Sequence, residues 1–244
     1  MKIEHDPQLI RELYSILQSG FDKDAEDRAL GIHATDLVYC LTRSFYEKMP
    51  AESSELGRLP HSDQEIVYFV TGQALEAALF PQLETRHLVT EYNGVLFSPD
   101  YRHLGQRFVE LKSTRGSQKK YETEGFPETY IRQMKNYCMA EGHLDYNLLV
   151  VYIIPALIVP YRITFTLEEM AEHRQWFDNR HKVLEYHLRV GTPPTPFVWN
   201  MEPEKGDKSW DCKSCRYLMR CGGIKGISQF QASLRIAEER MGGK

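Results

Sequence analysis

The longest apolar run of the chain, which begins after Asn147, limits the folds open to it. Every residue from there to Ile154 is apolar or aromatic, so the run lacks the alternation of a half-exposed strand and is typical of one buried on both faces. A more alternating strand over residues 158–165 is expected to pair with it. Pro155 and Pro160 interrupt the stretch, which falls short of the ~20 residues of a membrane-spanning helix. We therefore predict an α/β fold without a membrane segment.

Two carboxylates and an amine occur together in the sequence VLFSPDYRHLGQRFVELKST. Residues 95–97 form a predicted strand, residues 107–111 form the next one, and Asp100 lies between them. Because side chains alternate along a strand, Glu110 and Lys112 share one face. Pairing of the two strands as neighbours would bring Asp100 beside them.

This combination suits metal-assisted hydrolysis of phosphodiesters. Two neighbouring carboxylates bind a hard cation such as Mg²⁺ through oxygen. An adjacent lysine can orient or deprotonate the attacking water. Short acid-x-lysine strings are also common on solvated strands, where they have no chemical role.

Helices are predicted where apolar periodicity is preceded by a capping residue. Ser62 with Glu65, and Thr166 with Glu169, have the spacing of capping boxes. The expected helices cover residues 7–18, 36–48, 62–80, 127–141 and 167–190, with a further one over residues 228–240.

Five cysteines are present, and three of them form a C-x2-C-x5-C pattern near the C-terminus. Because the sequence shows no apolar secretory signal, we expect a cytoplasmic protein with reduced thiols. Three thiols so close together indicate a metal site, and a tetrahedral thiolate site needs a fourth ligand. The candidates for it are Cys40 and Cys138, of which Cys138 lies in a predicted helix and is expected to be a buried free thiol. The solitary fourth ligand favours iron–sulfur over zinc, although spacing alone does not separate the two.

These motifs resemble the PD-(D/E)XK nuclease superfamily, in the branch that carries an iron–sulfur cluster. The similarity is greatest to the CRISPR-associated iron–sulfur exonucleases and their phage and viral relatives, and the AddB nuclease domain is more distant. The matching motifs run from about residue 33 to about residue 225. They are TDLVYC with Cys40, SPDYR with Asp100, VELKST with Glu110 and Lys112, RQMKNY with Gln133 and Tyr137, and CKSCRYLMRC with Cys212, Cys215 and Cys221.

The resemblance implies a restriction-endonuclease-like mixed sheet flanked by helices. A 4Fe–4S clasp on Cys40, Cys212, Cys215 and Cys221 would join the N-terminal helix to the C-terminal tail. We expect a single nuclease domain over residues 1–244, with its core at about 62–190 and cluster-binding segments at about 33–48 and 205–225.

The resemblance also implies site residues. Relatives carry a metal-binding histidine on the helix before the first core strand, and this chain has Glu76 at that place. His33 is the next candidate for the same role. The set expected to hold Mg²⁺ or Mn²⁺ is Glu76, Asp100, Glu110 and the Leu111 carbonyl, and the set expected to act in catalysis is Asp100, Glu110, Lys112, Gln133 and Tyr137.

The net charge of −4 would not suggest a DNA-binding protein, but an acidic active site lowers this total, so the distribution of charge matters more. Positive charge is concentrated locally, and such residues contact phosphates or simply form a solvated face. The candidate DNA-binding residues are Arg43, Arg115, Lys119 and Lys120.

The function expected from these features is that of a metal-dependent deoxyribonuclease. The resemblance implies a 5′→3′ exonuclease acting on single-stranded DNA or free ends, in CRISPR spacer acquisition or in phage and viral recombination and replication. Proteins of those pathways would be its partners. The alternative is a noncatalytic DNA-binding or adaptor subunit built on a nuclease fold, which would have no need of the acid-acid-lysine set.

Overall fold

The structure is a computed structural model that describes residues 8, 11–17, 30–53, 56–80, 89–103, 107–154, 156–194 and 215–221. The chain divides into two compact units. The first consists of Met1–Val38 and Pro60–Lys182, and the second of Tyr39–Leu59 and Val183–Lys244. The single-domain organisation stays a prediction.

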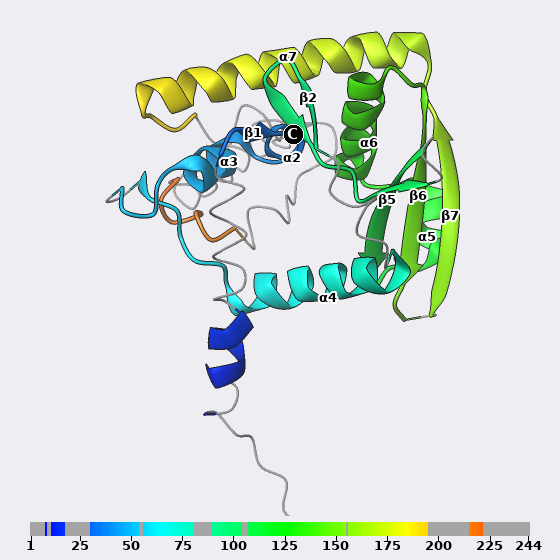
Figure 1. Cartoon of the computed structure of the whole chain (residues 1–244), viewed down its shortest axis with the longest axis horizontal. Helices are drawn as coiled ribbons and strands as arrows, with labels where there is room; N and C mark the ends of the chain where they lie inside the picture. The colour runs from blue at the N-terminus through cyan, green and yellow to red at the C-terminus, as the bar shows by residue number, and fades with distance from the viewer. Residues whose placement is uncertain are drawn as a thin grey trace, which may run out of the picture. The chain divides into compact units, whose positions relative to one another are not determined.

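The first unit contains a four-stranded mixed sheet, of which Figure 1 labels β5, β6 and β7. Its strands, in spatial order, are β4 (Tyr101–His103), β5 (Arg107–Thr114), β6 (Asp145–Tyr152) and β7 (Leu157–Thr164). Only the central pair, β5 and β6, is parallel. The mixed sheet with helices against it agrees with the predicted α/β class.

Strand β6 confirms the strand predicted from the apolar run, and its pairing with β7 is confirmed as well. The first residues of β6 alternate between half-buried and buried, and Val150, Val151 and Tyr152 are all buried. The run continues past the strand, because Ile153 and Ile154 lie in the turn before β7 and are exposed. Apolar character therefore predicted the strand but not its end.

A second, three-stranded sheet has the order β1 (Ile32–His33), β3 (Val95–Phe97) and β2 (Thr90–Tyr92). The prediction that residues 95–97 and 107–111 form neighbouring strands is wrong, because β3 pairs with β1 and β2. The antiparallel neighbour of β5 is instead the short strand β4, which the sequence pattern did not predict.

The helices of the first unit begin largely where the caps predicted. Both capping boxes form, with Ser62 and Glu65 before α4 and with Thr166 and Glu169 before α7. Helix α6 ends at Gly142, whose φ of 72° is a left-handed conformation that glycine adopts readily, and β6 follows at once. Besides a helical segment over residues 11–17, the helices are α2 (Ala34–Val38), α4 (Asp63–Leu79), α5 (Gln118–Glu124), α6 (Glu128–Glu141) and α7 (Leu167–Val190), the last of which continues into the second unit.

The second unit contains α3 (Leu41–Lys48) and the turn formed by residues 215–221. The continuous helix predicted over residues 36–48 is wrong, because α2 ends at Val38 and Cys40 is the N-cap residue of α3, with φ −58° and ψ 119°. These backbone angles are not helical, so the chain bends where the cluster ligand is expected.

Among the described residues, no helix is both long and apolar enough to cross a membrane. The helix predicted over residues 228–240 lies outside the described residues. So does Cys212, one of the four expected cluster ligands.

Candidate active site

Asp100 lies directly before β4, and the pairing of that strand brings it to Glu110. Tyr101 is opposite Val109, so one further step in the same antiparallel register places Asp100 opposite Glu110. The backbone N–H of Leu111 donates a hydrogen bond of 2.7 Å to Asp100 Oδ2. The structure therefore brings the two predicted carboxylates together, through a strand that the sequence did not reveal.

Glu110 and Lys112 lie on one face of β5, as the two-residue spacing predicts. Lys112 Nζ forms an ion pair with Glu110 Oε1, and 1% of the Glu110 side chain and 18% of the Lys112 side chain are exposed. The Lys112 ammonium also lies 5.4 Å from the centre of the Tyr130 ring. A buried carboxylate is thus paired with an amine that still reaches solvent.

The surroundings of Glu110 raise its pKa from 4.5 to about 8. The main cause is burial, which disfavours the charged form, and the next is the negative charge of Asp100. The Lys112 charge and hydrogen bond act in the opposite direction, and Glu76, in the last turn of α4, raises the pKa further. The carboxylates of Asp100 and Glu76 therefore both lie close enough to act on Glu110.

The donor set fits a hard divalent cation such as Mg²⁺ or Mn²⁺. Glu110 Oε2 is buried and has no hydrogen-bond partner within the part of the chain that the structure describes. Clustered carboxylate oxygens are the ligands that such cations prefer. No three His, Cys, Asp or Glu side chains among the described residues converge into a ready-made metal site, so these carboxylates would have to move closer together around an ion.

Gln133 and Tyr137 lie on one face of α6, and both are buried. Gln133 Nε2 donates to the Tyr137 hydroxyl at 3.1 Å, and that hydroxyl donates to the Ser98 carbonyl at 3.0 Å. Ser98 precedes Asp100 by two residues. The pair therefore positions the segment that carries Asp100.

Tyr146 is a site residue that the sequence reasoning missed. Its side chain is buried, and its hydroxyl has no hydrogen-bond partner among the residues that the structure describes. Burial raises its pKa well above 10, and the charges of Glu110, Tyr137 and Asp100 raise it further, which places the hydroxyl near the acidic pair. Tyr146 lies just before the predicted strand, so no sequence signal marked it, and its place near the acidic pair depends on the β5–β6 register.

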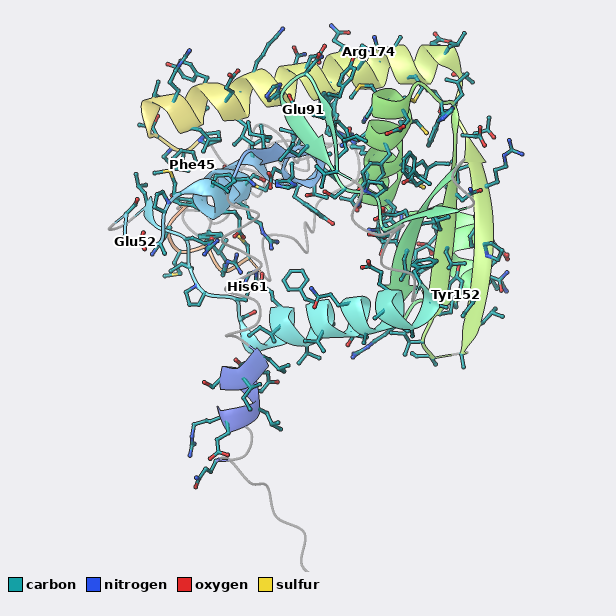
Figure 2. The ribbon with its side chains drawn as sticks, in the orientation of Figure 1. Phe45, Glu52, His61, Glu91, Tyr152 and Arg174 are labelled. Carbon is teal, nitrogen blue, oxygen red and sulfur yellow. The ribbon has the colours of Figure 1, made fainter. Side chains whose placement is uncertain are left out.

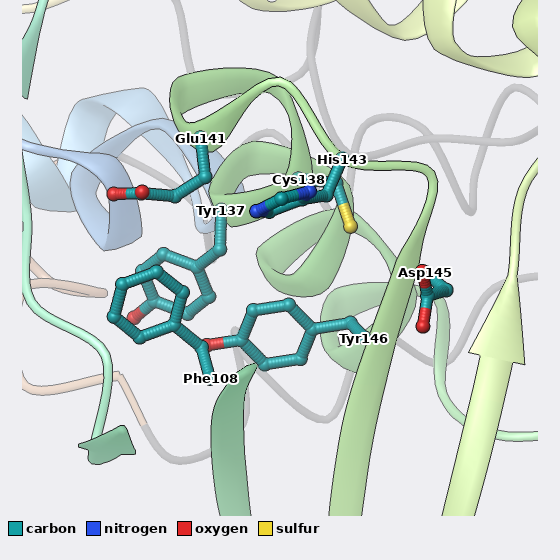
Figure 3. A pocket seen from close by; sticks show the side chains of 7 residues that line it. All are labelled: Phe108, Tyr137, Cys138, Glu141, His143, Asp145 and Tyr146. Carbon is teal, nitrogen blue, oxygen red and sulfur yellow. The ribbon is translucent and has the colours of Figure 1, made fainter. Parts of the chain in front are cut away.

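A cavity of about 180 Å³ adjoins the aromatic residues of the site. In Figure 3 the rings of Phe108, Tyr137 and Tyr146 lie together on one side of it, with His143 and Cys138 across from them. The Tyr146 ring stacks on Phe108 at 6.4 Å and on Tyr137 at 5.5 Å. The three rings therefore pack on one another and form one wall of the cavity.

The remaining predicted residues lie in several places. Arg115, Lys119 and Lys120 are exposed just beyond the end of β5. His33 lies in β1, and its backbone N–H donates to Asp36 Oδ2 at 2.7 Å. Arg43 belongs to the second unit.

The second unit gathers three of the four expected cluster ligands. The pKa of Cys215 is raised to about 11, mainly by burial, and the charges of Cys40 and Cys221 contribute to the shift, so the three sulfurs are neighbours. They do not form a ready-made ligand group among the described residues. Cys138 is buried in the first unit, in the cavity wall.

Direct contacts between side chains hold the turn formed by residues 215–221 against α3. Arg216 forms an ion pair with Glu47, which also lies 3.5 Å from Arg43. The Tyr217 ring stacks on Tyr46 with centroids 5.1 Å apart. The turn is therefore fixed to α3 by packing and charge as well as by any shared ligand.

No family model matches this sequence, and a search of curated proteins finds no match. Among solved structures, the crystal structure of SSO0001 is similar with a TM-score of 0.48 and 19% identity, over 85% of this chain and 94% of that one. The alkaline exonuclease LHK-Exo from Laribacter hongkongensis is similar with a TM-score of 0.42 and 14% identity, over 66% of this chain and 90% of that one. A phage-related exonuclease from Haemophilus somnus 129PT has a TM-score of 0.39 and 11% identity, over 67% of this chain and 97% of that one. Scores and identities this low establish neither a shared fold nor a shared activity, so the function proposed below rests on the residues of the site.

The raised pKa of Glu110 makes stability depend on pH in the metal-free protein. A carboxyl group that binds its proton more tightly in the folded chain gives full stabilisation below the ordinary pKa of 4.5, and this stabilisation is lost as the pH rises through about 8. Stability should therefore fall between these values, by at most about 1.4 kcal/mol per pH unit from this group. Glu110→Gln should flatten the slope.

Urea unfolding in EDTA at a series of pH values measures this slope. Asp145→Asn is the matched control, because Asp145 is a half-buried carboxylate of the same sheet that pairs with Arg162. Identical slopes for the wild-type protein and Glu110→Gln would contradict the assignment.

Proposed function

We propose that this protein is a metal-dependent deoxyribonuclease that hydrolyses phosphodiester bonds. The observation that carries the proposal is the buried Glu110 carboxyl group with Asp100 beside it and Lys112 paired to it. Burying a charged group is costly unless other charges compensate for it, and one lysine beside several carboxylates leaves negative charge in excess. A bound divalent cation would neutralise that excess.

The residues have distinct roles in the proposed reaction. Glu76, Asp100 and Glu110 would hold Mg²⁺ or Mn²⁺, together with the Leu111 carbonyl. The cation would supply charge stabilisation for the phosphate and lower the pKa of a water. Lys112 would hold the attacking water with its ammonium group, and Glu110 would keep that ammonium in place through their ion pair.

The bond changes are those of hydrolysis. The water oxygen forms a bond to phosphorus, the bond from phosphorus to the leaving deoxyribose oxygen breaks, and a proton ends on that oxygen. Gln133 and Tyr137 would act indirectly, by holding the Ser98 carbonyl and with it Asp100. This arrangement differs from a binding module, which has no use for a buried acid–lysine pair.

The finer parts of the proposal come from the resemblance of the motifs. They are 5′→3′ exonuclease action on single-stranded DNA or free ends, and a role in CRISPR spacer acquisition or in phage and viral recombination and replication. Proteins of those pathways would be the partners, in the cytoplasm. A 4Fe–4S cluster on Cys40, Cys212, Cys215 and Cys221 would tie α3 to the C-terminal segment. The neighbouring sulfurs of Cys40, Cys215 and Cys221 support this part.

Cleavage of DNA should require added Mg²⁺ or Mn²⁺ and should be lost in Asp100→Asn, Glu110→Gln and Lys112→Met. Removing one ligand or the lysine removes an interaction on which the reaction depends, so losses of about a hundredfold or more are expected. The measurement uses single-stranded DNA labelled at either end, which also reports polarity. Asp145→Asn should retain activity.

Tyr137→Phe should lower kcat more than it weakens DNA binding. The substitution removes the hydrogen bond to the Ser98 carbonyl, which positions the segment before Asp100, but it removes no metal ligand. Cleavage without added metal would contradict the metal-dependent mechanism. Full activity of all three site variants with folding intact would show that these residues do not carry the reaction, and would favour the noncatalytic adaptor instead.

The cluster part is tested separately by anaerobic purification. The protein should be brown and contain about four iron and about four sulfide per chain, as a cysteine-ligated cubane requires. Cys40→Ser, Cys215→Ser or Cys221→Ser should lose iron, whereas Cys138→Ser should retain it. A colourless protein with one zinc would overturn the iron–sulfur proposal and leave the nuclease proposal intact.

A further inference from the structure

The turn between β6 and β7 exposes an unusual concentration of apolar side chains. Those with large exposed apolar surface are Ile153, Ile154, Leu157 and Ile158, and we call these four residues the apolar tip. Exposed apolar side chains concentrated at one turn of a protein commonly mark an interaction site. Folding of the first unit leaves these side chains exposed, although the last three residues of β6, just before the turn, are buried.

The apolar tip is hydrogen-bonded to β5, the strand that carries Glu110 and Lys112. The backbone N–H of Ile153 donates to the Thr114 carbonyl at 2.9 Å, at the end of β5. Lys112 lies opposite Val150, three residues before Ile153, and three residues of a strand span about 10 Å. The tip is therefore about one to two nucleotides from the proposed site of cleavage, at ~6 Å per nucleotide of an extended strand. Figure 2 labels Tyr152 at this end of the sheet.

Basic side chains adjoin the apolar tip. Arg115 directly follows Thr114, and α5 follows with Lys119 exposed near its start. The Tyr121 hydroxyl is hydrogen-bonded to Thr114 Oγ1 at 2.8 Å, which holds α5 against this end of β5. The acidic residues of α5 lie towards its other end, where Glu124 is 4.0 Å from Lys120 and Glu122 accepts from Gln118.

An apolar surface bordered by cations matches the end of a DNA duplex. A terminal base pair presents a flat apolar face, and a phosphate backbone runs along each side of it. Proteins that part stacked bases use Ile, Leu and similar side chains as wedges, with Arg and Lys on the phosphates. A protein partner would also cover the apolar residues, but the cations beside them and the short path to Lys112 favour DNA.

We propose that the apolar tip is a wedge that opens the end of a DNA duplex and directs one strand to the acidic site. Ile153 and Ile154 pack on the last intact base pair, while Arg115 and Lys119 hold the backbone of the separated strand. The substrate class is then a duplex end, from which a single strand is delivered. This inference rests on the proposed nuclease function.

Ile154→Asp tests the wedge on three DNA substrates of one sequence: a blunt duplex, the same duplex with a short unpaired fork, and the single strand. The variant should degrade the blunt duplex about tenfold more slowly, a loss of about 1.4 kcal/mol, and should leave the other two rates within about twofold. Leu167→Asp is the matched control, because its side chain is 75% exposed, against 74% for Ile154, and lies at the start of α7. It should change none of the three rates.

Equal losses on all three substrates, no loss on any, or a wild-type enzyme that degrades the single strand but never a blunt end would each overturn the wedge. So would a dimer of the wild-type protein that Ile154→Asp dissociates, because the tip would then be a contact between copies of the chain.

A second readout does not depend on cleavage. A 2-aminopurine in the terminal base pair should become brighter when wild-type protein binds the duplex in EDTA, because it is unstacked, and Ile154→Asp should abolish the increase without loss of folding. An increase that persists in Ile154→Asp would overturn the wedge. If no DNA is cleaved but the 2-aminopurine brightens, the nuclease proposal fails and the wedge stands.

Discussion

The burial of one carboxyl group, that of Glu110 in the middle of β5, is the constraint on which the rest of the site depends. A buried charge needs compensation, and the chain provides Lys112 on the same face of the strand. Burial is the main cause that raises the pKa of Glu110 to about 8, and the negative charge of Asp100 close by contributes to the shift. Two neighbouring carboxylates at a buried position cost stability, and the proposed cation between them would offset that cost.

The surrounding structure fixes this arrangement from two directions. The register of β4 on β5 places Asp100 opposite Glu110, and the backbone N–H of Leu111 donates a hydrogen bond to the Asp100 carboxylate. From the opposite side, Tyr137 on α6 binds the Ser98 carbonyl, and its ring stacks on Tyr146. A change in α6 would therefore act on the site through the position of Asp100.

Local signals in the sequence predicted those helices and strands that are determined by interactions between neighbouring residues. The apolar run predicted β6, and the capping box at Ser62 predicted the start of α4, because neighbouring residues alone produce both features. Partners distant in sequence were not predictable. Strand β4 is only three residues long, β3 belongs to the other sheet, and the place of Tyr146 depends on the register of two parallel strands. The two-residue spacing of Glu110 and Lys112 was a sufficient signal for that pair, because alternation along one strand determines it.

The most direct test of the central claim is to locate a bound cation without relying on cleavage. Crystals of the protein soaked in Mn²⁺ would be measured at a wavelength where manganese scatters anomalously. The account predicts an anomalous peak between the carboxylates of Asp100 and Glu110, within reach of Glu76, and its loss in Asp100→Asn. A protein that binds Mn²⁺ only elsewhere, or a peak that persists unchanged in Asp100→Asn, would contradict the account.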